Sequence, residues 1–287
     1  SSDLFNSLRE IFKMRKILLA STALVAMSVT AAQADISISG SVSFEVADNG
    51  TATTFVDDSN LMITGGRAMD NGVTATVAMN ITGGAAAAVA EDTYIDLSGD
   101  FGSVRMGDTD DALDRMDGVN PANWDNEGIA QAGTSMAIGG DGDANISFLS
   151  PSISGATFYG ATTAEGANTG VGVNYSAGPV TIMAQNGQNG TSEENLMAAE
   201  MTFSGIRVGF SAGTTQATQA TAKVKYRAMG AQYTMGAAKL TATSQKLVGG
   251  DTYSNVGVAY TVAPGMSVVL ESGSQGDASG TYAHLNV

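Results

Sequence analysis

The chain has 287 residues, 43% of them hydrophobic, and a formal net charge of −15. The excess of acids disfavours nucleic acid as a partner. The chain has no cysteine and one histidine, His284, which excludes disulfides and thiolate sites and leaves little basis for histidine chemistry. No enzyme constellation is present, so we predict that the protein is not an enzyme.

The N-terminal region has the pattern of a secretory signal peptide over residues 14–34. Met14 is followed by Arg15, Lys16, an apolar run over 17–29 and the small-residue ending Ala32-Gln33-Ala34. The apolar run is shorter than the ~20 residues that span a bilayer. We expect residues 1–13 to be an upstream extension that is not native, and residues 35–287 to form the folded domain. Residues 1–34 contain four bases and two acids, so the processed chain has a net charge of −17.

No segment after residue 34 has 18 successive apolar residues, so a membrane-spanning structure must be a closed β-barrel. Strict alternation begins at once: one face of 36–46 is apolar and the other is polar. The apolar face comprises Ile36, Ile38, Val42, Phe44 and Val46, and the polar face Ser37, Ser39, Ser41, Ser43 and Glu45. This is the pattern of a wall with lipid on one side and water on the other.

Alternating segments continue to the end of the chain and predict sixteen strands in all. They lie near 36–46, 60–65, 73–80, 93–98, 103–108, 145–150, 155–163, 170–177, 180–186, 196–204, 206–214, 222–234, 237–246, 253–262, 265–272 and 281–287. Short turns such as 177–179 and 263–265 alternate with longer polar stretches, which is typical of an all-β, antiparallel, up-and-down transmembrane barrel. A soluble secreted sandwich or solenoid is the alternative.

The longest polar stretch follows the hairpin of Thr93 to Asp108. Between 108 and 145 it carries nine acids against the single base Arg115, and a loop of that length and charge indicates a functional segment. The acids are Asp108, Asp110, Asp111, Asp114, Asp117, Asp125, Glu127, Asp141 and Asp143. Asp141 and Asp143 resemble the alternate oxygen ligands of calcium loops but lack the remaining spacing, so a calcium site there is a weak candidate beside a solvated turn. Otherwise we expect no cofactor and no metal.

Four segments together resemble the Gram-negative general porins, particularly those of alphaproteobacteria. They are 61–73 with its Asp-Asn-Gly turn, 94–107 (YIDLSGDFGSVRMG), 145–155 (NISFLSPSISG) and 253–266 with its Ala-Pro-Gly-Met turn. The resemblance covers nearly all of residues 35–287. It implies a homotrimeric barrel of about sixteen strands in the outer membrane, whose third loop folds inward and narrows the pore.

The C-terminus departs from the pattern of this family, whose chains usually end in an aromatic residue. This chain ends at Val287, after His284-Leu285-Asn286. If the last strand began at Thr281, its ~7 residues would fall short of the ~9–11 that cross a membrane, and we therefore expect a truncated closing strand.

The alternation also predicts where the basic side chains point. If Val208, Phe210, Val224 and Tyr226 face lipid, their neighbours face the lumen, since Lys or Arg on the lipid face near the midplane costs about 2–4 kcal/mol. The predicted wall bases are Arg105, Arg207, Lys223, Lys225, Arg227 and Lys239. We expect these bases to lie across water from Asp108, Asp110, Asp111, Asp114 and Asp117 and to form a charged constriction. The alternative is that they are rim residues. Trp124 is expected to pack against the wall.

These features predict a passive outer-membrane diffusion channel for small hydrophilic solutes and ions, modestly selective for cations. Outer-membrane lipid, lipopolysaccharide and two further copies of the chain are the expected partners. The alternative is a secreted or surface-exposed acidic β protein, adhesin-like and without a channel. A channel dedicated to one substrate would need a ligand ladder that the sequence does not reveal.

Overall fold

The computed structural model describes residues 35–48, 53–84, 89–108, 118–124, 144–163, 168–216 and 221–287. No helix within these ranges is long and apolar enough to cross a membrane. The predicted extension, the signal peptide and most of the acidic loop lie outside the described residues.

The described residues form sixteen strands and one short 3-10 helix. The first eight strands are β1 (Asp35–Asp48), β2 (Thr53–Ala68), β3 (Thr74–Gly84), β4 (Val89–Gly99), β5 (Gly102–Asp108), β6 (Ala144–Leu149), β7 (Ala156–Thr163) and β8 (Asn168–Ala177). The other eight are β9 (Val180–Asn189), β10 (Ser192–Phe203), β11 (Ile206–Gln216), β12 (Val224–Met235), β13 (Ala238–Leu247), β14 (Thr252–Ala263), β15 (Met266–Gln275) and β16 (Ala278–Asn286). The helix, η2, spans Pro121–Asn123.

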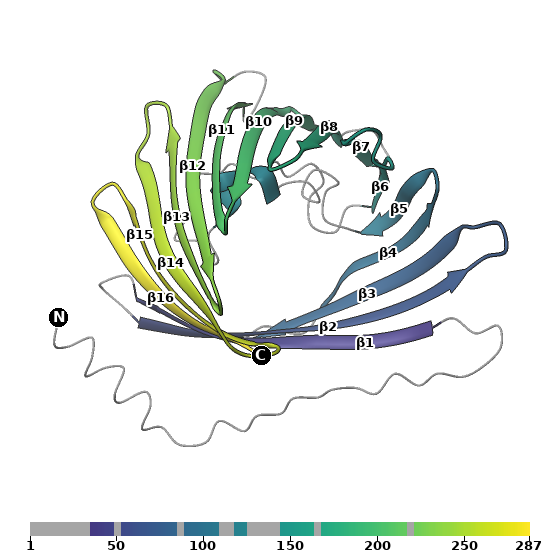
Figure 1. The fold of residues 1–287 in the computed structure, drawn as a ribbon, viewed down its shortest axis with the longest axis horizontal. Coiled ribbons are helices and arrows are strands. Elements are labelled where there is room, and N and C mark those ends of the chain that lie inside the picture. Colours follow the sequence, from purple (N-terminus) through teal and green to yellow (C-terminus); the bar gives the residue numbers. More distant parts are fainter. Residues whose placement is uncertain are drawn as a thin grey trace.

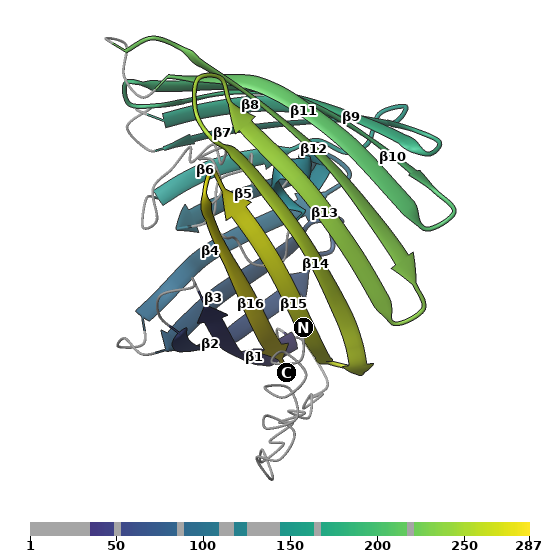
Figure 2. The same ribbon diagram turned by 90° about the vertical axis from the view of Figure 1, so that its left-hand side faces the viewer.

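Each strand pairs antiparallel with its neighbours in the sequence, and β1 pairs with β16 to close a barrel (Figure 1). The strands run obliquely around the wall (Figure 2). The predicted up-and-down barrel of sixteen strands is therefore confirmed, and the sandwich and solenoid alternatives are excluded. At one end of the barrel, two-residue turns join β4 to β5, β8 to β9, β10 to β11, β12 to β13 and β14 to β15, whereas the turns after β2 and β6 are longer. Gly178 and Gly236 take a φ of 59° in two of these turns, a conformation that costs glycine little.

The closing strand is longer than the sequence predicted. β16 begins at Ala278 rather than Thr281 and spans nine residues. Of these, Thr281 to Asn286 pair with β1. Val287 then exchanges two backbone hydrogen bonds of 3.0 Å with Val42. The predicted start at Thr281 was three residues too late, because Ala278, Ser279 and Gly280 carry no apolar alternation, yet their backbone continues the ladder with β15. Within the described residues the register pairs β16 with Ser43 to Asp48 of β1 and not with Asp35 to Ser41, and a truncated closing strand stays a prediction.

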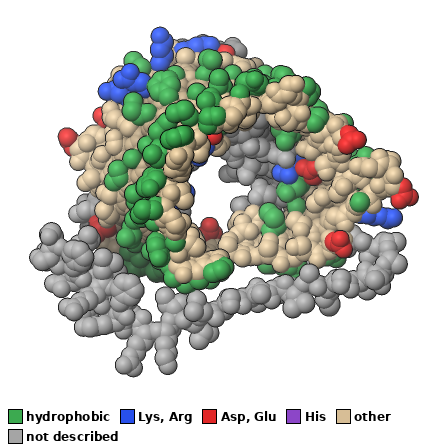
Figure 3. Space-filling view, in the orientation of Figure 1, with side chains coloured by type: hydrophobic (Ala, Val, Ile, Leu, Met, Phe, Trp, Pro, Cys, Tyr) green, Lys and Arg blue, Asp and Glu red, His purple; other side chains and the backbone are tan. Residues whose placement is uncertain are grey.

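The two faces of the wall follow from the register, because residues paired across antiparallel strands share a face. On β1 the predicted apolar face is exposed on the outside, with Ile36 65% and Val42 57% exposed. A lipid bilayer requires such an apolar outer face on the strands that contact it. The space-filling view shows hydrophobic side chains over the outer wall around a central opening (Figure 3).

Several strands extend beyond their predicted bounds at the end of the barrel that carries the longer loops. β2 begins at Thr53 and β10 at Ser192, whereas the sequence placed their starts near 60 and 196. Backbone pairing continues there through residues that do not alternate between apolar and polar, so the sequence pattern ends before the strand does.

Part of the inner wall is apolar rather than polar. Tyr159, Met183, Leu196 and Tyr226 pack together on the inside of β7 to β12. Val119, which belongs to the long loop between β5 and β6, joins the same cluster. An apolar patch inside a water-filled barrel must be covered, and Val119 shows that the long loop contributes to its cover.

Candidate functional site

The described part of the long loop, residues 118–124, lies inside the barrel against β11, β12 and β13 (Figure 1). Asn120 caps the N-terminus of the short helix within it, and its side-chain oxygen accepts a 3.2 Å hydrogen bond from the Ala122 amide. Pro121 occupies the first helical position, where no amide donor is needed. Asn120, Pro121 and Ala122 are buried. The predicted inward folding of the third loop is therefore observed for this segment.

Polar side chains of three neighbouring strands hold this segment to the wall. The Ser211 hydroxyl on β11 donates to Asn120 Oδ1 at 2.7 Å. Gln232 Nε2 on β12 donates to the Trp124 carbonyl at 3.0 Å, and Gln245 Nε2 on β13 donates to the Ala122 carbonyl at 2.8 Å. Each such bond contributes ~0.5–1.5 kcal/mol net, and together they fix the position of the helix on the wall.

The indole of Trp124 fills a space made by two glycines of the inner wall. A Cβ at Gly209 on β11 would lie 2.5 Å from the ring, and a Cβ at Gly230 on β12 would lie 2.9 Å from it. Trp124 is 3% exposed, and its Nε1 donates to the Gly118 carbonyl at 2.9 Å. The expected packing of Trp124 against the wall is observed, and the absence of side chains at Gly209 and Gly230 permits it.

Gly230→Ala tests this fit because the nearest atoms to the added Cβ belong to the loop, at 2.9 Å from both Pro121 Cβ and Trp124 Cε3. Overpacking costs about 1–3 kcal/mol, so we expect roughly tenfold faster tryptic cleavage after Arg115, the one Lys or Arg between 109 and 143. Gly66→Ala is the matched control, since its Cβ would meet Thr76 Oγ1 at an ordinary 3.6 Å. Equal cleavage of both variants would contradict the fit.

Arg207 on β11 points inward, as predicted, and contacts both the loop and the wall. Its guanidinium carbon lies 4.0 Å from the centre of the Trp124 ring, and it donates to the Gly118 carbonyl. Its Nε also donates to Glu200 Oε2 of β10 at 2.7 Å, in an ion pair whose side chains are 27% and 16% exposed. Arg207 therefore connects the carboxylate of the wall to the backbone of the loop.

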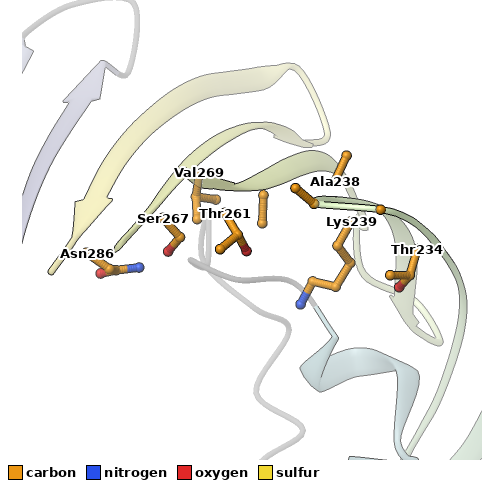
Figure 4. Close-up of a pocket in the computed structure, with 10 residues that line it drawn as sticks. Thr234, Ala238, Lys239, Thr261, Ser267, Val269 and Asn286 are labelled. Atoms are coloured by element: carbon orange, nitrogen blue, oxygen red, sulfur yellow. The ribbon is translucent and has the colours of Figure 1, made fainter. Parts of the chain in front are cut away.

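Arg105 and Lys239 also face the lumen, as predicted. Arg105 Nε pairs with Asp96 on the adjacent β4 at 3.1 Å, and its guanidinium lies 3.8 Å from the centre of the Tyr94 ring. Lys239 on β13 extends into a pocket of the inner wall shared with Thr234, Thr261, Ser267 and Asn286 (Figure 4).

The predicted inward direction of Lys223, Lys225 and Arg227 is wrong. Tyr226 and Ala228, at 2% and 1% exposed, occupy the inner face of β12, so Lys225 and Arg227 lie on the outer face. Lys223 pairs at 2.9 Å with Glu193, whose neighbour Glu194 faces inward. The error came from assigning Tyr226 to lipid, and a shift of one residue reverses every side chain of a strand.

Tyr226 turns inward because the opposing strands accommodate both its ring and its hydroxyl. The ring lies over Gly213, where an added Cβ would be 2.7 Å from it, and the hydroxyl donates to Glu194 Oε1 at 2.8 Å. Tyr159 repeats the arrangement over Gly172 and donates to Gln185 at 2.7 Å. A buried tyrosine that satisfies its hydroxyl is stable on the inner wall.

The acids expected to face these bases lie outside the described residues, apart from the backbone of Asp108 at the end of β5. Asp110, Asp111, Asp114 and Asp117 belong to this group, as do the calcium candidates Asp141 and Asp143. Within the described ranges, no group of three or more acidic or histidine side chains could hold a metal ion.

The sequence did not identify the partners that anchor the loop. Glu200, Ser211, Gln232 and Gln245 were missed because each is an ordinary polar residue on an inward position. A usable sign was present, because Gly209 and Gly230 leave the inward face of β11 and β12 without side chains close to Arg207. Glycine within a strand often marks the close approach of another group.

Comparison with known proteins agrees with this architecture. A double mutant of the porin of Rhodopseudomonas blastica matches with a TM-score of 0.75 at 16% identity, covering 88% of this chain and 99% of that one. Another double mutant of the same porin matches with a TM-score of 0.73 at 18% identity, over 88% and 98%. No sequence among the curated proteins matches significantly. The family model for Gram-negative porins matches residues 20–279, and the chain therefore belongs to the Gram-negative porin family.

Proposed function

We propose that the third loop narrows the lumen of this passive outer-membrane channel to a charged constriction that admits small hydrophilic solutes and modestly prefers cations. The observation that carries the proposal is the docking of residues 118–124 on the inner wall through Ser211, Gln232 and Gln245. This segment belongs to the loop between β5 and β6 but lies against β11, β12 and β13 inside the barrel.

The charges of the described wall favour cations. The inward-facing acids include Glu45, Asp96, Glu194, Glu200 and Glu271, and the inward-facing bases are Arg105, Arg207 and Lys239. Arg105 and Arg207 are each paired with an acid, so their charges are largely compensated. The five loop acids of 108–117 would add to this negative lumen and to the field across the constriction.

The direct test of this preference is the reversal potential of the purified channel in a planar bilayer under a salt gradient. We expect a potential of the sign produced by cations, increasing as salt is lowered because screening weakens. A potential of the opposite sign would contradict the proposed selectivity. In liposome swelling, uncharged sugars should enter at rates that fall with their size, whereas rates independent of size would contradict a narrow constriction.

Homotrimeric assembly, association with lipopolysaccharide and a calcium ion at Asp141 and Asp143 remain predictions. The wide apolar outer face of β1 to β3 supports the first of these, because Ile36, Val42 and Phe55 are more than half exposed on it. The adhesin-like alternative finds no support in a closed barrel that belongs to a family of channels.

A further inference from the structure

We propose that a cavity on the inner wall of β12 to β16, near the short-turn end of the barrel, binds a small solute that carries one carboxylate and several hydroxyl groups. The cavity has a volume of about 420 Å³, within the ~300–1,000 Å³ range of small-molecule sites. Its polar side chains supply an amine, three hydroxyls and an amide, from Lys239, Thr234, Thr261, Ser267 and Asn286. Among the described residues, no acid lines it.

The register of the barrel brings these side chains into two neighbouring rows of the inner face. In the first row, Thr234 on β12 is opposite Lys239, and Lys239 is opposite Ala259 on β14. The second row consists of Thr261, Ser267 and Asn286, from β14, β15 and β16. Lys239 and Thr261 project to the same side of the wall (Figure 4). Opposed Cβ atoms are ~4.5–5.5 Å apart and successive rows ~7 Å apart, so one solute of several carbon atoms reaches both rows.

Lys239 gives the cavity a positive charge. Within the described part of the chain it forms no ion pair, whereas the other inward-facing bases, Arg105 and Arg207, each have a carboxylate partner. Glu271 on β15 lies one row farther from the short turns, and its Oε1 accepts a 2.6 Å hydrogen bond from Asn255 Nδ2. An anion in the cavity would therefore meet a cation whose charge no carboxylate of the described wall pairs with.

The side chains of the cavity indicate the class of solute. One ammonium group matches a single negative charge, whereas a phosphate dianion is better held by several bases or by a nest of backbone amides. Hydroxyl and amide groups both donate and accept hydrogen bonds, so they match the hydroxyls of a polyol. Val269 is the one large apolar side chain among the described lining residues, and an apolar solute would gain little from it. A polyhydroxylated monocarboxylate fits this set.

The cavity is separate from the proposed constriction. Lys239 lies about 20 Å along β13 from Gln245, which holds the loop segment, at ~3.3 Å per residue. It is close to the turn between β12 and β13, at the end that faces the periplasm in this class of barrel. Binding in the cavity requires no ion flow, so the binding measurement stands or falls independently of the cation preference proposed above.

The test measures the binding of gluconate to the full-length folded protein in phosphatidylcholine nanodiscs, by saturation-transfer NMR at low salt with empty nanodiscs as the blank. Glucose is the neutral probe, and glucose 6-phosphate is the dianionic one. We expect saturable binding of gluconate in the millimolar range, at least ~10-fold tighter than that of glucose. Lys239→Gln should weaken it at least ~10-fold, and Lys239→Arg, which keeps the charge, should bind within about threefold of the wild type.

Two further variants separate the charge from the hydroxyls. Arg67→Gln removes a base from the outer face at the same end of the barrel, so it should bind gluconate as the wild type does. Thr261→Val removes one hydroxyl without changing the size of the side chain. It should weaken gluconate binding about 2- to 10-fold and leave the binding of acetate, which has no hydroxyl, unchanged.

Four results would overturn the proposal. Equal binding of gluconate and glucose by the wild type would show that the carboxylate is not recognised. Tighter binding of glucose 6-phosphate would assign the cavity to phosphates. Unchanged gluconate binding by Lys239→Gln would place the site elsewhere. A reversal potential that changes in Lys239→Gln, without saturable binding of gluconate by the wild type, would limit the lysine to an effect on ion flow.

Discussion

Trp124→Ala is expected to release the third loop from the wall while the barrel still assembles. The indole is 3% exposed and fills the space above Gly209 and Gly230, so its removal leaves a cavity and costs about 3–5 kcal/mol of loop docking. The sixteen strands are joined by backbone hydrogen bonds that do not involve this side chain. We expect tryptic cleavage after Arg115 to accelerate at least ~100-fold and single-channel currents to become noisier.

Phe158→Ala is the matched control, because this aromatic residue is 50% exposed on the outside of β7 and touches no part of the loop segment. It should leave both cleavage and current noise unchanged. Trp124→Phe should fall between the two, since a phenyl ring fills part of the space but cannot donate to the Gly118 carbonyl. If Trp124→Ala were cleaved at the wild-type rate, the indole would not anchor the loop.

Arg207→Gln is expected to destabilise the docking of residues 118–124 on the wall by about 1–3 kcal/mol and to strengthen the cation preference of the channel. The substitution removes the interaction with Trp124 and the bond to the Gly118 carbonyl, and it leaves the carboxylate of Glu200 without its basic partner. Partial exposure of the ion pair keeps the effect below that of a fully buried one. Unfolding by urea in lipid vesicles measures the first effect, and the reversal potential measures the second.

The double variant Glu200→Gln/Arg207→Gln separates the ion pair from the other contacts of Arg207. If the two side chains stabilise each other, the double variant should lose less stability than the two single variants added together. Strict additivity would mean that the pair contributes nothing. Arg67→Gln, which removes an exposed arginine from the outer face of β2, should change stability by less than about 0.5 kcal/mol.

The strand count and the apolar outer face of β1 could be predicted from the sequence because alternation with a period of two records both the strand and its orientation. Arg105, Arg207 and Lys239 were oriented correctly for that reason. The same rule failed on β12, since a tyrosine suits either face and only the contacts with Gly213 and Glu194 decide which one it takes. Those contacts join residues of different strands, so they cannot be predicted from the sequence of β12 alone.

The position of the loop was predictable only in outline. Family resemblance implied inward folding, and Trp124 was expected to pack on the wall. The places where it docks depend on glycines at 209 and 230 and on glutamines at 232 and 245, which the barrel brings together from three strands. Lys225 and Arg227 were expected to face inward because a basic side chain on the lipid face is costly at the membrane midplane. Both residues lie within the first four of β12, near the rim of the barrel, where that cost is small.

The most direct test of a charged constriction compares the reversal potentials of three channels in the same salt gradient. They are the wild type, the loop variant D108N/D110N/D111N/D114N/D117N, and the outer-face control Lys225→Gln/Arg227→Gln. We expect the loop variant to lose most of the cation preference, because the proposed constriction takes its negative charge from these acids, and the control to keep it, because its bases lie on the outer face. A loop variant as selective as the wild type would contradict the account.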